Sequence, residues 1–132
     1  MIQKVIELGP GFSDLYELMT LIRTNRHRLR HIFRIESEIA DHIAVSFAAA
    51  FDPAPPSSFQ PVYLCREGIR VKPGETNQRI AAMEACAQEL NRPIIVLRTK
   101  PSTAYADPQQ YYMHLIALLR SGRYLPEPHN FW

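Results

Sequence analysis

The sequence predicts one α/β domain over residues 1–132, in which helices pack on a mixed sheet of about five strands. Apolar residues recur at helical spacing in three segments and at every second position in others, which gives the element order β-α-β-β-β-α-β-α. A predicted helix separates two short apolar runs, and this pattern indicates a right-handed crossover between parallel strands. An α+β arrangement of the same elements is the alternative class.

The first half of the chain is predicted to form a strand, a helix and a hairpin. Residues 2–8 form the strand, and a Gly-Pro-Gly turn leads to a helix at about 15–27 that Asp14 caps. Two runs of period two, 28–36 and 43–51, flank the segment "SEIAD" and predict the hairpin. The second run is small or apolar on both faces, which is typical of a central strand.

The second half contains two strands and two helices. A strand at 61–65 and the run "PIIVLR" at 93–98 enclose a helix at about 77–90. The second of these is a short apolar run, which predicts a buried strand. In the last helix Asp107 is the cap, Pro108 takes the first helical position and Gln110 the third, and Gly122 stops the helix.

Composition excludes several classes of protein. The net charge is only +2, so no strong overall field calls for a nucleic-acid partner. No apolar stretch is long enough to span a bilayer, and the N-terminus lacks the regions of a signal peptide. Cys65 and Cys86 fit neither a disulfide framework nor a common zinc pattern, so we interpret them as small apolar residues. We therefore expect a cytoplasmic protein with no membrane partner.

The Gly-Pro-Gly turn lies in "VIELGPGFSDLYELM", residues 5–19, which resembles the cofactor loop of S-adenosylmethionine-dependent methyltransferases. Ser13 stands where a third glycine is often found, and the acids Glu36 and Glu38 come late for a ribose contact. A hairpin follows the helix instead of a second parallel strand. We therefore interpret the segment as a strand-to-helix turn and expect no cofactor.

The strongest local charge is the basic run "RTNRHRLRHIFR" at 23–34. Arg28, Arg30 and Arg34 share one face of the predicted strand, where they could bind phosphates. Acidic residues follow at once within 36–41, and no aromatic stacking pattern accompanies the arginines. We favour an exposed, partly ion-paired face, and nucleic-acid binding is the alternative.

The α-β-β-β-α-β order from residue 15 to 98 is similar to the core of restriction-endonuclease-like proteins, which hold Mg²⁺ between strand carboxylates. By position Asp41 matches the first acid, but Leu64 and Arg66 stand where the second acid and its lysine belong. A catalytic Mg²⁺ site needs both carboxylates. The resemblance thus implies at most a decayed nuclease, and we predict no catalytic and no metal-binding residues.

The predicted topology gathers several loop residues at one edge of the sheet. Arg66 and Glu67 follow one strand, Lys100 and Ser102 follow its parallel partner, and Asp14 follows the first strand. Ligands favour the crevice beyond the carboxyl ends of parallel strands. Cations beside a hydroxyl could hold a phosphate or carboxylate there, and simple loop charges are the alternative.

Three segments, "IELGPGFSDLYEL", "FQPVYLCREGI" and "KPSTAY…YYMHLI", are similar to a family of small uncharacterised Bacillus-type proteins. The resemblance implies a bacterial protein of unknown function, and it supplies no activity. Some members carry a methylthioribose kinase label. This chain has no HRD-like or DFG-like stretch, and it is too short for a kinase domain.

These observations lead to one main hypothesis and two alternatives. The main one is a non-enzymatic binding or regulatory protein whose crevice takes an anionic small molecule or peptide. The first alternative is a nucleic-acid-binding protein or decayed nuclease-like domain. The second is a homodimer formed through the Pro-broken tail 124–132, which ends in Phe131 and Trp132.

Overall fold

The structure is a computed structural model that describes residues 2–9, 14–55, 59–65 and 68–126. Its strands are β1 (Ile2–Glu7), β2 (Leu29–Ile39), β3 (His42–Phe51), β4 (Phe59–Leu64), β5 (Ile69–Val71) and β6 (Ile94–Arg98). Its helices are α1 (Asp14–Thr24), α2 (Gln78–Glu89) and α3 (Pro108–Ser121), with the 3-10 turns η1 (Arg26–Arg28) and η2 (Ser102–Ala104).

All six strands form one mixed sheet in the order β1-β4-β3-β2-β6, and β5 pairs with β3 beyond the end of β4. β1 is parallel to β4 and β6 is parallel to β2, whereas β3 is antiparallel to β2, β4 and β5. Every strand except β3 therefore runs in the same direction. The predicted mixed α/β fold and the central position of β3 are confirmed.

The crossover through α2 leads from β4 to β6, which run in the same direction, as predicted. They are not neighbours in the sheet, because β3 and β2 lie between them. β4 and β5 together act as one interrupted strand along β3. Leu64 pairs with Ala48 and Ile69 pairs with Val45, so the chain has four residues between these two pairs where β3 has two. An interruption of this kind bends a strand and ends its regular pairing, as β-bulges do.

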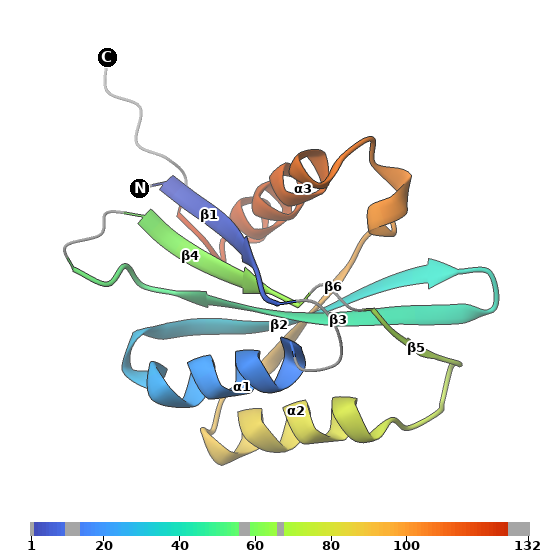
Figure 1. The fold of residues 1–132 in the computed structure, drawn as a ribbon, viewed down its shortest axis with the longest axis horizontal. Coiled ribbons are helices and arrows are strands. Elements are labelled where there is room, and N and C mark those ends of the chain that lie inside the picture. The colour runs from blue at the N-terminus through green and yellow to red at the C-terminus, as the bar shows by residue number, and fades with distance from the viewer. Residues whose placement is uncertain (1, 10–13, 56–58, 66–67, 127–132) are drawn as a thin grey trace.

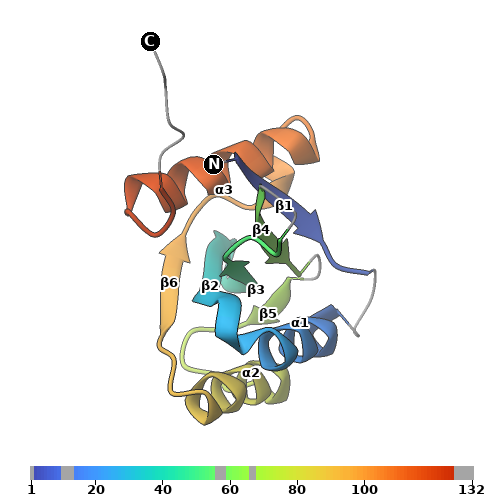
Figure 2. The same cartoon turned by 90° about the vertical axis from the view of Figure 1, so that its left-hand side faces the viewer.

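The sheet separates two layers of helices, with α1 and α2 on one face and α3 on the other (Figure 1, Figure 2). Each face buries its own apolar cluster, because residues of period two along the strands alternate between the faces. The first cluster includes Leu18, Phe47 and Met83, and the second includes Phe33, Val62 and Leu115. No helix in the described ranges is long and apolar enough to cross a membrane.

The two ends of α3 test the start and stop residues that the sequence predicts for this helix. The Asp107 carboxylate accepts from the Gln110 N–H at 3.0 Å, which confirms the predicted cap. The helix stops before Gly122 as predicted, but the left-handed residue is Arg123, with a φ of 64°. Glycine is needed at 122 for another reason, since a Cβ there would lie 2.7 Å from the ring of Tyr124.

The prediction that the apolar run at 93–98 is a buried strand is wrong. β6 lies at the edge of the sheet, and none of its five residues is buried. Apolar character alone could not reveal this, because burial of a strand depends on where the sheet places it and on what covers it. The two cysteines do behave as predicted, since Cys65 and Cys86 are both free and buried.

Candidate functional site

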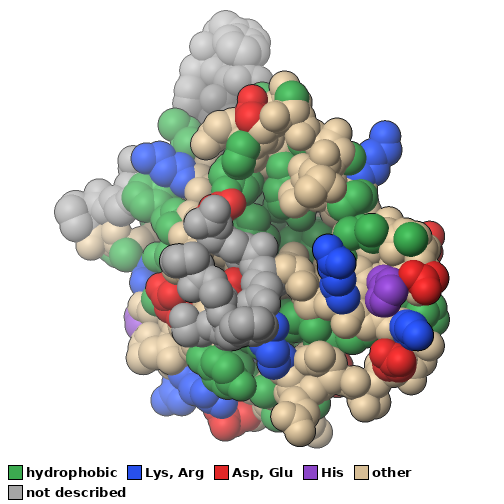
Figure 3. Space-filling view, turned by 45° about the vertical axis from the view of Figure 1, so that its right-hand side comes forward, with side chains coloured by type: hydrophobic (Ala, Val, Ile, Leu, Met, Phe, Trp, Pro, Cys, Tyr) green, Lys and Arg blue, Asp and Glu red, His purple; other side chains and the backbone are tan. Residues whose placement is uncertain are grey.

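One hollow of the molecule lies where α3 begins, over the part of the β2–β3 hairpin that the helix leaves uncovered. We call it the hairpin cleft; its volume is about 480 Å³. Its floor comes from both strands of the hairpin and from β5, and its walls come from the segment after β4 and from the loop between β6 and α3. Figure 3 looks onto this face and shows hydrophobic surface across its centre, with acidic and basic side chains around it.

Part of the floor is made of small residues, which leave room between the neighbouring isoleucines Ile35 and Ile39. Ser37 of β2 and Ala44 and Ser46 of β3 line it, and Arg70 of β5 lies beside Ala44 in the register of the sheet. Larger side chains at these strand positions would fill the hollow. Ile69 and Val71 pack in the core of the opposite face, so the alternation of the strand directs Arg70 to the cleft side.

A second hollow of about 880 Å³, which we call the lateral cleft, adjoins the first. Lys100 and Arg98 line it from the end of β6, and His114 lines it from α3. Ser37, Pro101 and Tyr105 line both hollows, so Tyr105 stands between them.

The structure brings together two of the five predicted ligand-binding residues. Ser102 lines the hairpin cleft, and Lys100 lines the lateral cleft next to it. Arg66 and Glu67 lie outside the described residues, although Cys65 and Gly68 on either side of them line the hairpin cleft.

Asp14 has a different environment from the other predicted ligand-binding residues. It is fully buried at the start of α1, and its carboxylate lies 3.7 Å from the guanidinium of Arg79 on α2. This ion pair belongs to the α1–α2 face of the sheet, opposite the clefts. Asp14 therefore joins two helices and does not meet Lys100.

Sequence reasoning missed Arg70, which is the cation that lines the hairpin cleft among the described residues. Within the described ranges no hydrogen bond or ion pair engages its side chain. The sequence gives only a weak indication of a strand here. In "IRV" one arginine stands between two aliphatic residues, a pattern that is typical of a strand with one polar face. Which face it occupies becomes clear only from the pairing of β5 with β3.

The aromatic wall of the hairpin cleft includes Tyr111, whose hydroxyl group remains protonated. Burial raises the pKa of Tyr111 to about 12, and the neighbouring Tyr105 adds to the effect. The rings of Tyr105 and Tyr111 lie 5.4 Å apart. A neutral phenol can donate a hydrogen bond to an anion at any physiological pH. Glu7 adds one carboxylate to the wall, and the Asp107 carboxylate is engaged in capping α3.

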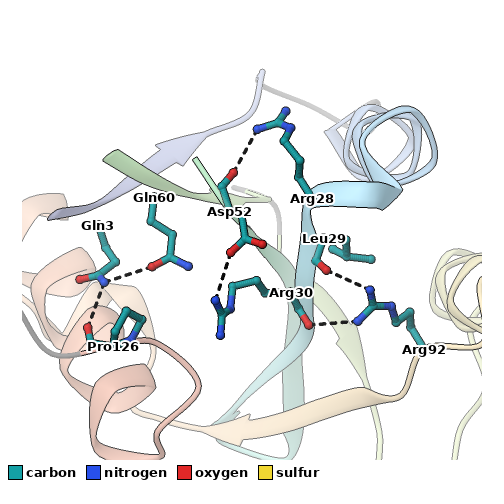
Figure 4. Close-up of polar contacts among 8 residues, drawn as sticks. All are labelled: Gln3, Arg28, Leu29, Arg30, Asp52, Gln60, Arg92 and Pro126. Atoms are coloured by element: carbon teal, nitrogen blue, oxygen red, sulfur yellow. Dashed lines mark hydrogen bonds and ion pairs between the residues drawn. The ribbon is translucent and has the colours of Figure 1, made fainter. Parts of the chain in front are cut away.

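The three arginines of the nucleic-acid alternative are engaged in contacts within the protein. Arg28 donates to the Asp52 carbonyl and Arg30 pairs with the Asp52 carboxylate, each at 3.1 Å (Figure 4). Arg34 lies 2.8 Å from the carboxylate of Glu36 on its own strand. Asp52 directly follows β3, and of the acids expected to pair with these arginines Glu36 does so.

The residues of the nuclease resemblance do not form a cluster of carboxylates. Asp41 lies in the hairpin turn, where its carboxylate is 2.7 Å from Nδ1 of His42. Leu64 is buried at the end of β4. Across the part of the chain that the structure describes, no three His, Cys, Asp or Glu side chains gather as a metal site would require.

Comparison with known proteins identifies the family of this chain and gives no information about its activity. A family model described as a domain of unknown function, DUF7147, matches residues 1–125. No curated protein and no solved structure matches the chain.

Proposed function

Because the chain belongs to the DUF7147 family, whose function is unknown, we propose from its geometry that it is a binding protein for a small anionic ligand held in the hairpin cleft. The observation that carries this proposal is the position of Arg70, which has no partner in the described ranges, in a hollow lined by aromatic side chains and a few polar groups. A phosphate or carboxylate group would supply the missing partner.

The rest of the cleft supports an organic ligand of modest size. Aromatic side chains give apolar contact, and the hydroxyls of Ser37, Ser46 and Ser102 offer hydrogen bonds that fix orientation. A mostly apolar hollow with a few convergent polar groups is the usual form of a small-molecule site. Lys100 in the adjoining lateral cleft provides a second cation for a ligand that extends past Tyr105.

A thermal-shift screen of phosphorylated and carboxylated metabolites tests this function. We expect a subset to raise the melting temperature of the wild-type protein, because a ligand that binds only the folded state stabilises it. Arg70→Ala should abolish the shift and Lys100→Ala should reduce it. Arg26→Ala is the matched control, since Arg26 is an exposed cation at the opposite end of the hairpin.

Two results would overturn the proposed function. One is a screen in which no anionic compound stabilises the protein. The other is a compound that stabilises wild type and Arg70→Ala equally, because its binding would then not depend on the cleft cation.

We further propose that this is a cytoplasmic protein of Bacillus-type bacteria, as the resemblance of its sequence suggests. Its two buried free cysteines suit a reducing compartment. Fractionation of such cells with an antibody to the protein should find it with cytosolic markers. Recovery with the culture medium or the membrane pellet would contradict this location.

A further inference from the structure

β6 is the most aliphatic strand of the sheet and the most exposed. Four of its five residues are isoleucine, valine or leucine, yet none is buried, and Val96 keeps 51% of its surface exposed. Figure 2 shows β6 at the outer edge of the sheet, between the layer of α3 and the layer of α1 and α2, with no helix or strand of the described residues beyond it. Its sequence suits a covered strand and its position leaves it uncovered.

The outer edge of β6 offers backbone groups for pairing. Thr99 N–H donates to the Glu36 carbonyl of β2 at 3.0 Å, which fixes the alternation along the strand. The N–H and C=O groups of Ile95 and Leu97 therefore face β2, and those of Ile94, Val96 and Arg98 face outward. No strand in the described ranges pairs with this outward row.

The opposite edge of the sheet is protected and β6 is not. β1 carries an exposed lysine, Lys4, and Gln3 ties it to the carbonyl of Pro126. Proteins normally shield an edge strand with charge, proline, a bulge or a covering element. Within β6 the sole charged residue is Arg98, at its end.

We propose that β6 pairs antiparallel with β6 of a second copy of this chain, about a two-fold axis at Val96. This register sets Val96 opposite Val96 of the second copy and Ile94 opposite Arg98, so that every outward backbone group finds a partner. Ile95 then lies beside Leu97 of the second copy on the α3 face. The edge becomes a continuous sheet through both molecules.

Charge complementarity favours this register. The Arg98 side chain is 86% exposed and lies 3.7 Å from Glu36. In the pair it would lie next to Ile94 of the second copy, which shares a shallow groove with Glu84. Glu84 is itself more than half exposed, and its carboxylate also lies 3.5 Å from the guanidinium of Arg34 in its own chain. The small net charge of +2 leaves little repulsion between two copies.

Light scattering on the full chain tests the pairing with variants that act at the axis. Wild type should have twice the mass of one chain. Val96→Lys and Val96→Asp should each be monomeric and folded, because each puts two like charges opposite one another. Their equal mixture should regain the double mass, since lysine then faces aspartate. Ile2→Lys is the matched control on the exposed edge of β1 and should remain dimeric.

A second measurement does not depend on variants. Hydrogen exchange in the wild-type protein should show slow exchange for the amides of Ile94, Val96 and Arg98, which would exchange fast at an open edge. The proposal is overturned if wild type is monomeric at every concentration, or if these three amides exchange fast in a dimer. A dimer that Val96→Lys leaves intact would also overturn it.

Discussion

His31 shows how one side chain links the sheet to the segment after α3. Its ring lies 5.8 Å from Phe33 and 5.5 Å from Tyr124, centroid to centroid. Burial lowers its pKa from the usual 6.5, and the positive charges of Arg30 and Arg92 lower it further. The neutral imidazole is therefore the form that the folded protein favours.

The lowered pKa predicts how stability depends on pH. Above pH 6.5 His31 is neutral in both the folded and the unfolded protein, so its contribution to the free energy of unfolding is fully present. As the pH falls through 6.5, the unfolded chain binds a proton at His31 before the folded protein does. The protein therefore loses stability until the pH has passed the lower pKa of the folded state. Urea unfolding between pH 8 and about 5 measures this. His31→Gln, which cannot titrate, should lose less stability over that range. Equal losses in the two proteins would contradict the assignment.

At the scale of elements, the sequence predicts the features that depend only on residues close together in the chain. The Asp107 cap, the hairpin and the helical faces depend on neighbours in the chain, and the structure confirms them. The exposure of β6 was not readable, because sheet order decides it. The contact that joins α3 to β1 could not be predicted either, because Gln3 and Arg120 are far apart in the sequence.

That contact gives a prediction about α3. Arg120 donates through Nε and Nη2 to the Gln3 amide oxygen, and the Gln3 amide nitrogen donates to the buried Gln60 at 3.2 Å. Arg120→Ala would leave a buried acceptor without its donors, at a cost of roughly 1–3 kcal/mol. Chemical denaturation should show this loss. Met113→Ala, an exposed change on the same helix, should stay within about 0.5 kcal/mol of wild type.

At the scale of the whole molecule, the shared strand direction places the clefts at one edge of the sheet. The general rule about strand ends predicts a crevice at this edge, and Ser102 and Lys100 line the two clefts that lie there. The rule does not say on which face of the sheet a residue at that edge lies. Asp14 follows β1 at that edge but faces the α1–α2 layer, while Arg70 reaches the cleft because β5 pairs with β3.

The most direct test of the proposed function is an amide NMR titration of the full chain with the best anionic compound from the thermal-shift screen. We predict chemical-shift changes that map to the hairpin cleft, at Ser37, Ser46 and Arg70, and that saturate with ligand. Arg70→Ala should lose them and Arg26→Ala should keep them. Changes that map to Arg28 and Arg30 instead, or that persist in Arg70→Ala, would contradict the assignment of the cleft as the binding site.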